Sequence, residues 1–242
     1  PPAGVGKVTR MLRRRLVLSS TALAATAILT ACSGAGEEPA KAPHEVISIA
    51  QEKLASAKCV HISLSTQELP PGQNGVAEAV GSGEFSTTEP KFQGTVQGRV
   101  KDVTANLEMI GIGDKAWWKL FTPDFTVADL ADVGAPNPAS FFHPVTGLPG
   151  LLGQATDVTA GKETRVGRDV VTTYSGKLPG KVIKDLLFLG DGTKPFDITF
   201  GITKDGELRQ AVTTGEFFTG TTSTYTLLIT DYGKAVTITA PL

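Results

Sequence analysis

The sequence predicts an α+β fold: one helix followed by a curled antiparallel sheet of about nine to eleven strands. Three observations support this prediction. Residues 44–58 repeat apolar residues at helical spacing, whereas from residue 59 onward apolar residues alternate with polar or small ones. The pairs EP, GD, DG and YG punctuate this alternation at intervals of roughly 8–12 residues, which is typical of hairpins in a meander.

The helix is expected first, over residues 44–58 (HEVISIAQEKLASAK). Val46, Ile47 and Leu54 fall on one face, and charged residues occupy the outward positions. Pro43 suits the start of this helix because its missing N–H would have no partner in the first turn. One face of the helix should therefore pack on the sheet.

The strands that follow have one apolar and one polar face, as expected for an antiparallel sheet with one solvated side. Segments 92–101, 196–202 and 223–239 show the alternation, and the last predicts two strands around a turn at residues 231–234. A sheet of about ten strands tends to curl. Four glycines lie on the apolar face, where glycine often marks a bend or a close approach. These glycines are Gly81, Gly83, Gly94 and Gly98.

The middle of the chain interrupts the strand pattern. Residues 122–160 are rich in Pro and Gly but also carry large apolar residues, so this segment should pack on the domain rather than form a solvated linker. We expect two short helical pieces here, over the mouth or the concave face of the sheet. A further helical piece is expected at residues 180–190, as a cover for the other end of the sheet.

The first residues read as a leader. Arg13, Arg14 and Arg15 precede an uncharged apolar run, residues 16–31, which is shorter than a membrane span and ends in small residues. Leu29-Thr30-Ala31-Cys32 fits a bacterial lipobox, in which the cysteine thiol takes a diacylglyceryl group. The alternative is ordinary signal cleavage with an incidental cysteine. The residues before Met11 are expected to have no role in the fold.

Three regions are therefore predicted. Residues 1–31 form a leader with a secretory signal that is removed, and residues 32–43 form the lipidated cysteine and a flexible tether. Residues 44–242 form a single domain. Two or three acyl chains would give stable anchoring, which places the protein at the extracytoplasmic face of the plasma membrane, in the cell envelope.

The charge limits the kinds of partner that the chain can bind, and the cysteine content limits its disulfides. The five Lys and Arg before Cys32 would be lost with the leader, which leaves 18 basic against 24 acidic residues, or a net charge of −6. This balance argues against nucleic acid and against a polybasic grip on anionic lipids. Cys59 is then the only remaining cysteine, so no intrachain disulfide is possible. We expect it to be a small buried residue at the helix–strand junction.

No pattern for catalysis is found. The three histidines, His44, His61 and His143, have no metal-ligand spacing, and no nucleophile elbow, P-loop or dinucleotide fingerprint occurs. We therefore expect no catalytic residues, no metal and no cofactor, and a turn or cap role for His143. Of the adjacent Trp117 and Trp118, at most one can line a groove, because neighbouring strand residues face opposite ways.

Three stretches, in this order, carry a family resemblance: SIAQEKLASAKCVHISLS, GSGEFSTTEPKFQGTVQG and ASFFHPVTGLPGLLGQATDV. Together with the lipobox they resemble the LppX/LprG-type lipoproteins of mycobacteria and related actinobacteria (LppX_LprAFG), over nearly the whole mature chain. The resemblance implies a half-barrel whose concave side holds helices and an apolar cavity. The AWWKLF stretch is bulkier than in the family, which bears on the size of that cavity.

The resemblance also implies a function without catalysis. Family members bind acylated glycolipids (phosphatidylinositol mannosides, lipomannan or lipoarabinomannan, or wax-type lipids) and carry them from the plasma membrane toward the outer envelope. A monomer is expected, with a membrane transporter as a candidate partner. The alternatives are a structural or interaction lipoprotein with a closed core and, with least support, an envelope hydrolase.

Carried onto this sequence, the resemblance names eleven ligand-binding residues. Seven form the cavity wall and four form a lid at the entrance. The wall residues are Phe85, Val96 (with Gly94 and Gly98 beside it), Leu107, Met109, Phe196, Ile198 and Phe200, and the lid residues are Phe141, Phe142, Leu148 and Leu151.

Overall fold

Eleven antiparallel strands form one sheet in the part of the chain that the structure, a computed structural model, describes: residues 41–67, 69–100 and 103–241. Their order is β6-β5-β4-β3-β2-β1-β11-β10-β9-β8-β7. The strands are β1 (Cys59–Thr66), β2 (Gly75–Glu84), β3 (Lys91–Val100), β4 (Val103–Ile112), β5 (Lys115–Lys119), β6 (Thr126–Val127), β7 (Thr156–Val166), β8 (Asp169–Leu178), β9 (Phe196–Ile202), β10 (Leu208–Phe218) and β11 (Thr221–Thr230).

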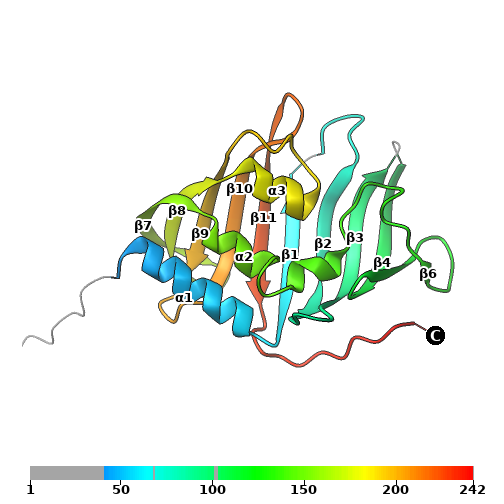
Figure 1. The fold of residues 1–242 in the computed structure, drawn as a ribbon, viewed down its shortest axis with the longest axis horizontal. Coiled ribbons are helices and arrows are strands. Elements are labelled where there is room, and N and C mark those ends of the chain that lie inside the picture. Colours follow the sequence, from blue (N-terminus) through cyan, green and yellow to red (C-terminus); the bar gives the residue numbers. More distant parts are fainter. Residues whose placement is uncertain (1–40, 68, 101–102, 242) are drawn as a thin grey trace, which may run out of the picture. The chain divides into compact units, whose positions relative to one another are not determined.

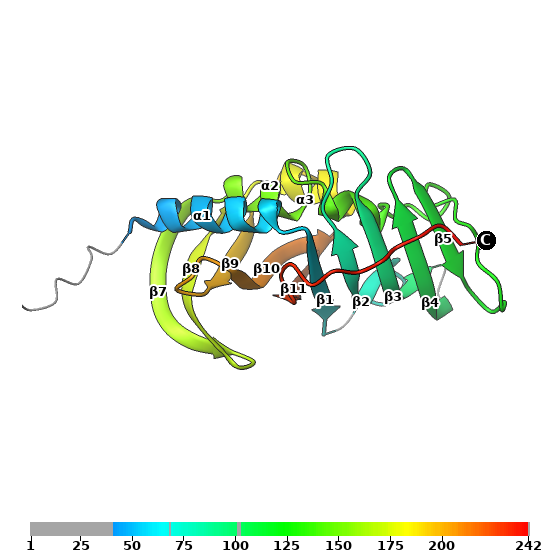
Figure 2. The same cartoon turned by 90° about the horizontal axis from the view of Figure 1, so that it is seen from below.

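The order of the strands explains how the sheet is built. β1 to β6 form a meander that runs outward on one side, and β7 to β11 form a second meander that runs back to the centre (Figure 1). There β11 pairs with β1, for example Leu64 opposite Leu227. β6 and β7 remain as unpaired edges, so the sheet is curved but not closed into a barrel (Figure 2). The predicted half-barrel and its number of strands are confirmed.

The helices of the described ranges lie on the same side of the sheet, over its concave face (Figures 1 and 2). They are α1 (Pro43–Ser56), the 3-10 helix η1 (Pro138–Phe142), α2 (Leu148–Gly153) and α3 (Gly180–Leu187). α1 packs on the core through Ile47, Ala50 and Leu54, as its helical spacing predicted. η1 and α2 are the two short pieces expected within residues 122–160, and α3 is the piece expected at 180–190.

The glycines on the apolar face make room for two phenyl rings. Gly81 and Gly94 lie opposite each other in β2 and β3. A Cβ atom at either one would come within 2.8 Å of the Phe92 ring. A Cβ at Gly83 would overlap the ring of Phe142. These glycines let aromatic side chains lie directly against the sheet backbone, which is the close approach that glycine permits.

Two expectations about strands were wrong. The segment expected to be a loop up to residue 160 becomes β7 at Thr156. The predicted last strand does not form: after Asp231 (φ +53°) the chain turns, and residues 234–241 have no regular structure. β1 and β10 already occupy both edges of β11, so a further strand has no free neighbour there. The final segment instead runs past the strands β1 to β4, with Gly233 N–H donating to Cys59 O (Figure 2).

Candidate functional site

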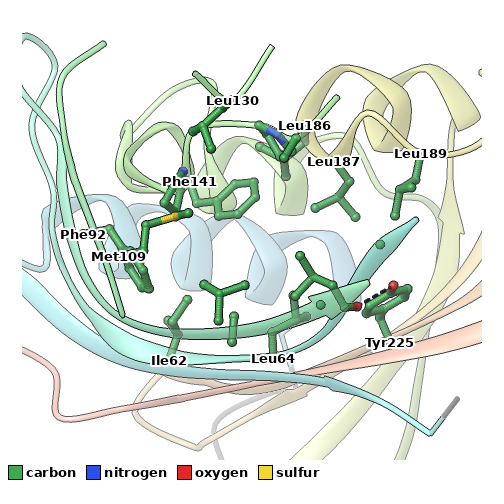
Figure 3. A pocket seen from close by; sticks show the side chains of 18 of the residues that line it. Ile62, Leu64, Phe92, Met109, Leu130, Phe141, Leu186, Leu187, Leu189 and Tyr225 are labelled. Atoms are coloured by element: carbon green, nitrogen blue, oxygen red, sulfur yellow. Dashed lines mark hydrogen bonds between the residues drawn. The ribbon is translucent and has the colours of Figure 1, made fainter. Parts of the chain in front are cut away.

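A cavity of about 400 Å³ lies between the concave face of the sheet and the helices (Figure 3). This volume is within the range of ligand pockets, roughly 300–1,000 Å³. Residues from opposite halves of the sheet contribute to the wall, for example Leu107 of β4 and Phe200 of β9. The pairing of β1 with β11 is therefore what brings the two parts of the wall together.

The sheet wall follows from the alternation of side chains in the strands, because residues two apart face the same side. Ile62 and Leu64 of β1 and Tyr225 and Leu227 of β11 show this pattern next to one another. Further sheet residues complete the wall. They are Ala79, Phe92, Val96, Ala105, Leu107, Met109, Trp118, Phe200, Leu208 and Ala211.

The wall opposite these strands comes from the helices and from the loops beside them. In Figure 3, Leu130, Leu186 and Leu187 lie on the side of the cavity opposite Ile62 and Leu64. Other residues from η1, α2, α3 and the segment after α3 join them, namely Phe141, Leu148, Leu151, Leu152, Ile183 and Leu189. α3 is amphipathic, and its buried face contains Ile183 and Leu186. Its leucines thus cover one end of the concave face.

The segment after α3 is held by polar contacts at the surface. Gly190 N–H donates to Phe217 O at 2.9 Å, and Lys194 Nζ lies 2.6 Å from Glu216 Oε2. The backbone N–H groups of Thr193 and Lys194 donate to Asp191 and hold the pKa of that carboxyl below its usual value. The Gly220 N–H and the Lys194 ammonium lower the pKa of Glu216 in the same way. These bonds hold the segment that follows α3 against the end of β10.

Few polar groups reach the cavity. Among the described residues that line it, four besides Trp118 with its indole N–H have polar side chains: Asn74, Arg99, Thr213 and Tyr225. Tyr225 O–H donates to Val76 O at 2.9 Å, and burial raises the pKa of Tyr225 to about 12, so its hydroxyl is neutral at physiological pH. Arg99 Nη1 donates to Pro70 O at 2.9 Å. Such a surface can hold hydrocarbon but offers no pair of groups for proton transfer.

The cavity opens to solvent where its wall carries exposed side chains. Val100 and Val103, at the end of the β3–β4 hairpin, are 37% and 57% exposed, and Phe121, after β5, is 86% exposed. All three line the cavity. We call this end of the cavity its mouth.

Seven of the eleven residues named from the sequence line the cavity. They are Val96, Leu107, Met109, Phe141, Leu148, Leu151 and Phe200. The other four pack elsewhere in the core. Phe142 is fully buried between Phe85 and Phe92, at ring distances of 5.4 Å and 5.9 Å. Phe196 packs on Phe217 at 4.6 Å, and Ile198 is buried beside it in β9.

Gly98 lines the cavity, whereas Gly94 is covered by the Phe92 ring. Sequence reasoning missed the leucines of α3 and the β1 and β11 residues in the wall. The alternation in β1 and β11 marks those strand residues, and the expected helical cover at residues 180–190 is confirmed, although its individual leucines were not named as ligand-binding residues.

The residues considered for other chemistry have structural roles. His143 Nδ1 accepts the N–H groups of Val145 and Thr146 at 3.2 Å and 3.1 Å, which is the predicted cap. Trp118 lines the cavity opposite Met109, whereas Trp117 faces the other way, so one of the two tryptophans contributes as expected. Cys59 is buried at the start of β1. No cluster of three or more His, Cys, Asp or Glu suited to a metal occurs within the described ranges.

An open, curved antiparallel sheet with helices over an apolar cavity defines a class of half-barrel proteins. The sequence comparison identifies which family of this class is present. A sequence model of the LppX_LprAFG lipoprotein family matches residues 42–238, so the chain belongs to this family. Members are lipoproteins and not enzymes, which confirms the expectation that the chain is not an enzyme.

Two solved structures share the fold. LprF from Mycobacterium bovis superposes with a TM-score of 0.71 at 14% identity, covering 82% of this chain and 96% of LprF. The lipoprotein LppX from Mycobacterium tuberculosis gives a TM-score of 0.60 at 16% identity, covering 81% of this chain and 97% of LppX. No curated protein sequence matches.

Family membership is consistent with a lipid ligand and with an envelope-associated, lipid-anchored protein. Cys32 and the leader lie outside the described residues. Within those residues no helix has both the length and the apolar character needed to cross a membrane.

Proposed function

We propose that the chain is a membrane-anchored carrier that binds acylated glycolipid in the apolar cavity and moves it from the plasma membrane toward the outer envelope. The observation that supports this is the cavity itself: about 400 Å³, walled mainly by apolar side chains from both halves of the sheet, with exposed residues at the mouth. A lipoprotein with a closed core would have no such space, so the cavity favours the carrier.

The energetics of such a cavity suit a carrier. Removing a CH₂ group from water is worth about 0.8 kcal/mol, but an acyl chain that leaves a bilayer is already out of water. Transfer from bilayer to cavity is therefore close to neutral, and the cargo can be released as readily as it is taken up. The sugar head remains in water at the mouth, where the wall is exposed.

The anchor belongs to the same proposal. Residues 1–31 are removed, Cys32 carries the acyl chains, residues 33–43 form a tether, and the domain follows from residue 44. A flexible coil of 11 residues spans roughly 18 Å r.m.s., which keeps the domain near the outer surface of the plasma membrane. A membrane transporter is the natural partner to load or receive the lipid.

A transfer assay tests the carrier function. The mature chain from Ser33, which lacks Cys32 and cannot be acylated, is mixed with donor vesicles containing labelled phosphatidylinositol mannoside and with unlabelled acceptor vesicles. We expect transfer to increase in proportion to protein concentration. Transfer that stays at the spontaneous rate at every protein concentration would contradict the proposal.

A further inference from the structure

Exposed apolar side chains gather around the mouth of the cavity. Among the described residues, seven large apolar side chains are exposed, and three of them line the cavity: Val100, Val103 and Phe121. A fourth, Phe188, is 57% exposed and lies between Leu187 and Leu189, which both line the cavity. We call these four residues the mouth rim. The exposed apolar side chains outside the mouth rim are Val127, Val145 and Val170.

The two phenylalanines of the mouth rim have an unusual backbone. Phe121 (φ +59°) and Phe188 (φ +57°) both adopt the left-handed conformation, which is uncommon for bulky residues. Phe188 caps the end of α3, a position that Gly or Asn usually occupies. Both rings are largely exposed, so packing within the chain does not offset the backbone strain. Strained residues of this kind are typical of functional sites.

We propose that the mouth rim inserts into the interfacial layer of a lipid bilayer, so that an acyl chain passes between bilayer and cavity without crossing water. This inference rests on the proposed function, because it adds the route by which the cargo enters. Exposed apolar patches mark membrane or protein contact sites. Here three of the four rim residues line the cavity itself, and Phe is among the apolar side chains with which interfacial segments enter a bilayer.

The net charge of the chain indicates which kind of lipid the mouth rim should bind. From Cys32 onward the chain has 18 basic and 24 acidic residues, so its overall field does not attract anionic lipids. Docking should therefore depend on the apolar rim rather than on lipid charge. Vesicles of zwitterionic phosphatidylcholine should bind the protein at least as well as vesicles that contain anionic phosphatidylglycerol.

The test uses a double variant that keeps the backbone conformation. Asn tolerates the left-handed region, so the double variant Phe121→Asn, Phe188→Asn should fold at least as well as the parent. The control is Val145→Thr, Val170→Thr, which changes two exposed valines outside the cavity wall. Binding of the chain from Ser33 to phosphatidylcholine vesicles is measured by sedimentation. The rim variant should lose roughly tenfold or more in partition coefficient, and the control less than about twofold.

Each outcome supports or overturns the rim proposal. It is overturned if the parent chain binds neither kind of vesicle, which is the result expected of a rim that contacts a protein instead. It is also overturned if the rim variant binds within about twofold of the parent. It is also overturned if binding requires anionic lipid. If the double variant is unfolded by circular dichroism, Phe121→Asn alone is measured and should still lose most of the binding.

Lipid occupancy of the parent chain, measured separately by mass spectrometry, keeps this test distinct from that of the proposed function. Bound lipid together with a rim variant that docks normally would overturn the rim alone. Normal docking without any bound lipid would instead contradict the carrier.

Discussion

Replacing Val96 by Trp should fill the cavity without disturbing the fold. Val96 lies in β3 between Ala79 of β2 and Leu107 of β4, and all three line the cavity. The side chain is partly exposed rather than enclosed by packed neighbours. The indole therefore extends into open space, and no neighbouring side chain has to move out of its way.

An open cavity and a filled core predict opposite signs for the change in stability that Val96→Trp causes. A buried aromatic side chain covers 150–250 Å², so Trp hides up to about 100 Å² more apolar surface than Val. At roughly 25 cal/mol per Å², this gives an upper bound of about 2.5 kcal/mol of stabilisation. If the concave face were instead a filled core, the overpacked side chain would destabilise the fold by about 1–3 kcal/mol.

Lipid loading should fall sharply in this variant. An indole that displaces four CH₂ groups of a bound acyl chain removes about 3 kcal/mol of binding free energy, which is more than 100-fold in affinity. Thr95→Trp is the matched control, because it adds the same ring on the opposite, exposed face of β3. Urea denaturation and loading of a fluorescent acyl lipid are measured on both. Destabilised Val96→Trp protein that still loads lipid like the parent would refute this reasoning.

Three further predictions follow from the packing and the titratable groups. Gly83→Ala should cost about 1–3 kcal/mol in unfolding free energy, because the added Cβ overlaps the Phe142 ring. Phe142→Leu should relieve part of that cost, and strict additivity in a double-mutant cycle would argue against the contact. Burial raises the pKa of all three tyrosines above 10, so absorbance at alkaline pH should show no tyrosine that titrates at its ordinary value. Because a raised pKa favours the neutral form in the fold, stability should decline as pH rises above 10 toward the Tyr225 value of about 12. The pKa values of Asp191 and Glu216 are lowered in the fold. Their contribution to folding stability should therefore be present above the ordinary pKa values of 3.8 and 4.5, and it should be lost as the pH falls below those values. Glu216→Gln should therefore show a smaller decrease in melting temperature between pH 5 and pH 3 than the parent. The same decrease in both proteins would exclude a contribution of the Glu216 carboxylate to stability.

Much of the fold was predictable because alternation is a local property. The apolar positions of β3 and β9 have period two, and this placed Val96 and Phe200 on the concave face as the structure shows. The helical spacing of α1 likewise identified its buried side. The pattern within one segment is sufficient for such predictions.

The division between core and cavity was not predictable in this way. Phe141 and Phe142 are neighbours in η1, yet Phe141 lines the cavity and Phe142 is fully buried between two other rings. That difference depends on Gly83, which lies more than fifty residues earlier and makes space for the Phe142 ring. The absent last strand has a similar cause, since it depends on which strands flank β11. Long-range neighbours decide these features, and local patterns do not contain them.

Native mass spectrometry of the chain from Ser33, purified from an actinobacterial host, shows whether the cavity carries lipid. A bound acylated glycolipid at about one per chain is expected, retained in Thr95→Trp and lost in Val96→Trp. Extraction and fragmentation of the released lipid would then identify the cargo. A chain that is purified without lipid, and stays without it when phosphatidylinositol mannosides are offered, would contradict the account of this protein as a lipid carrier.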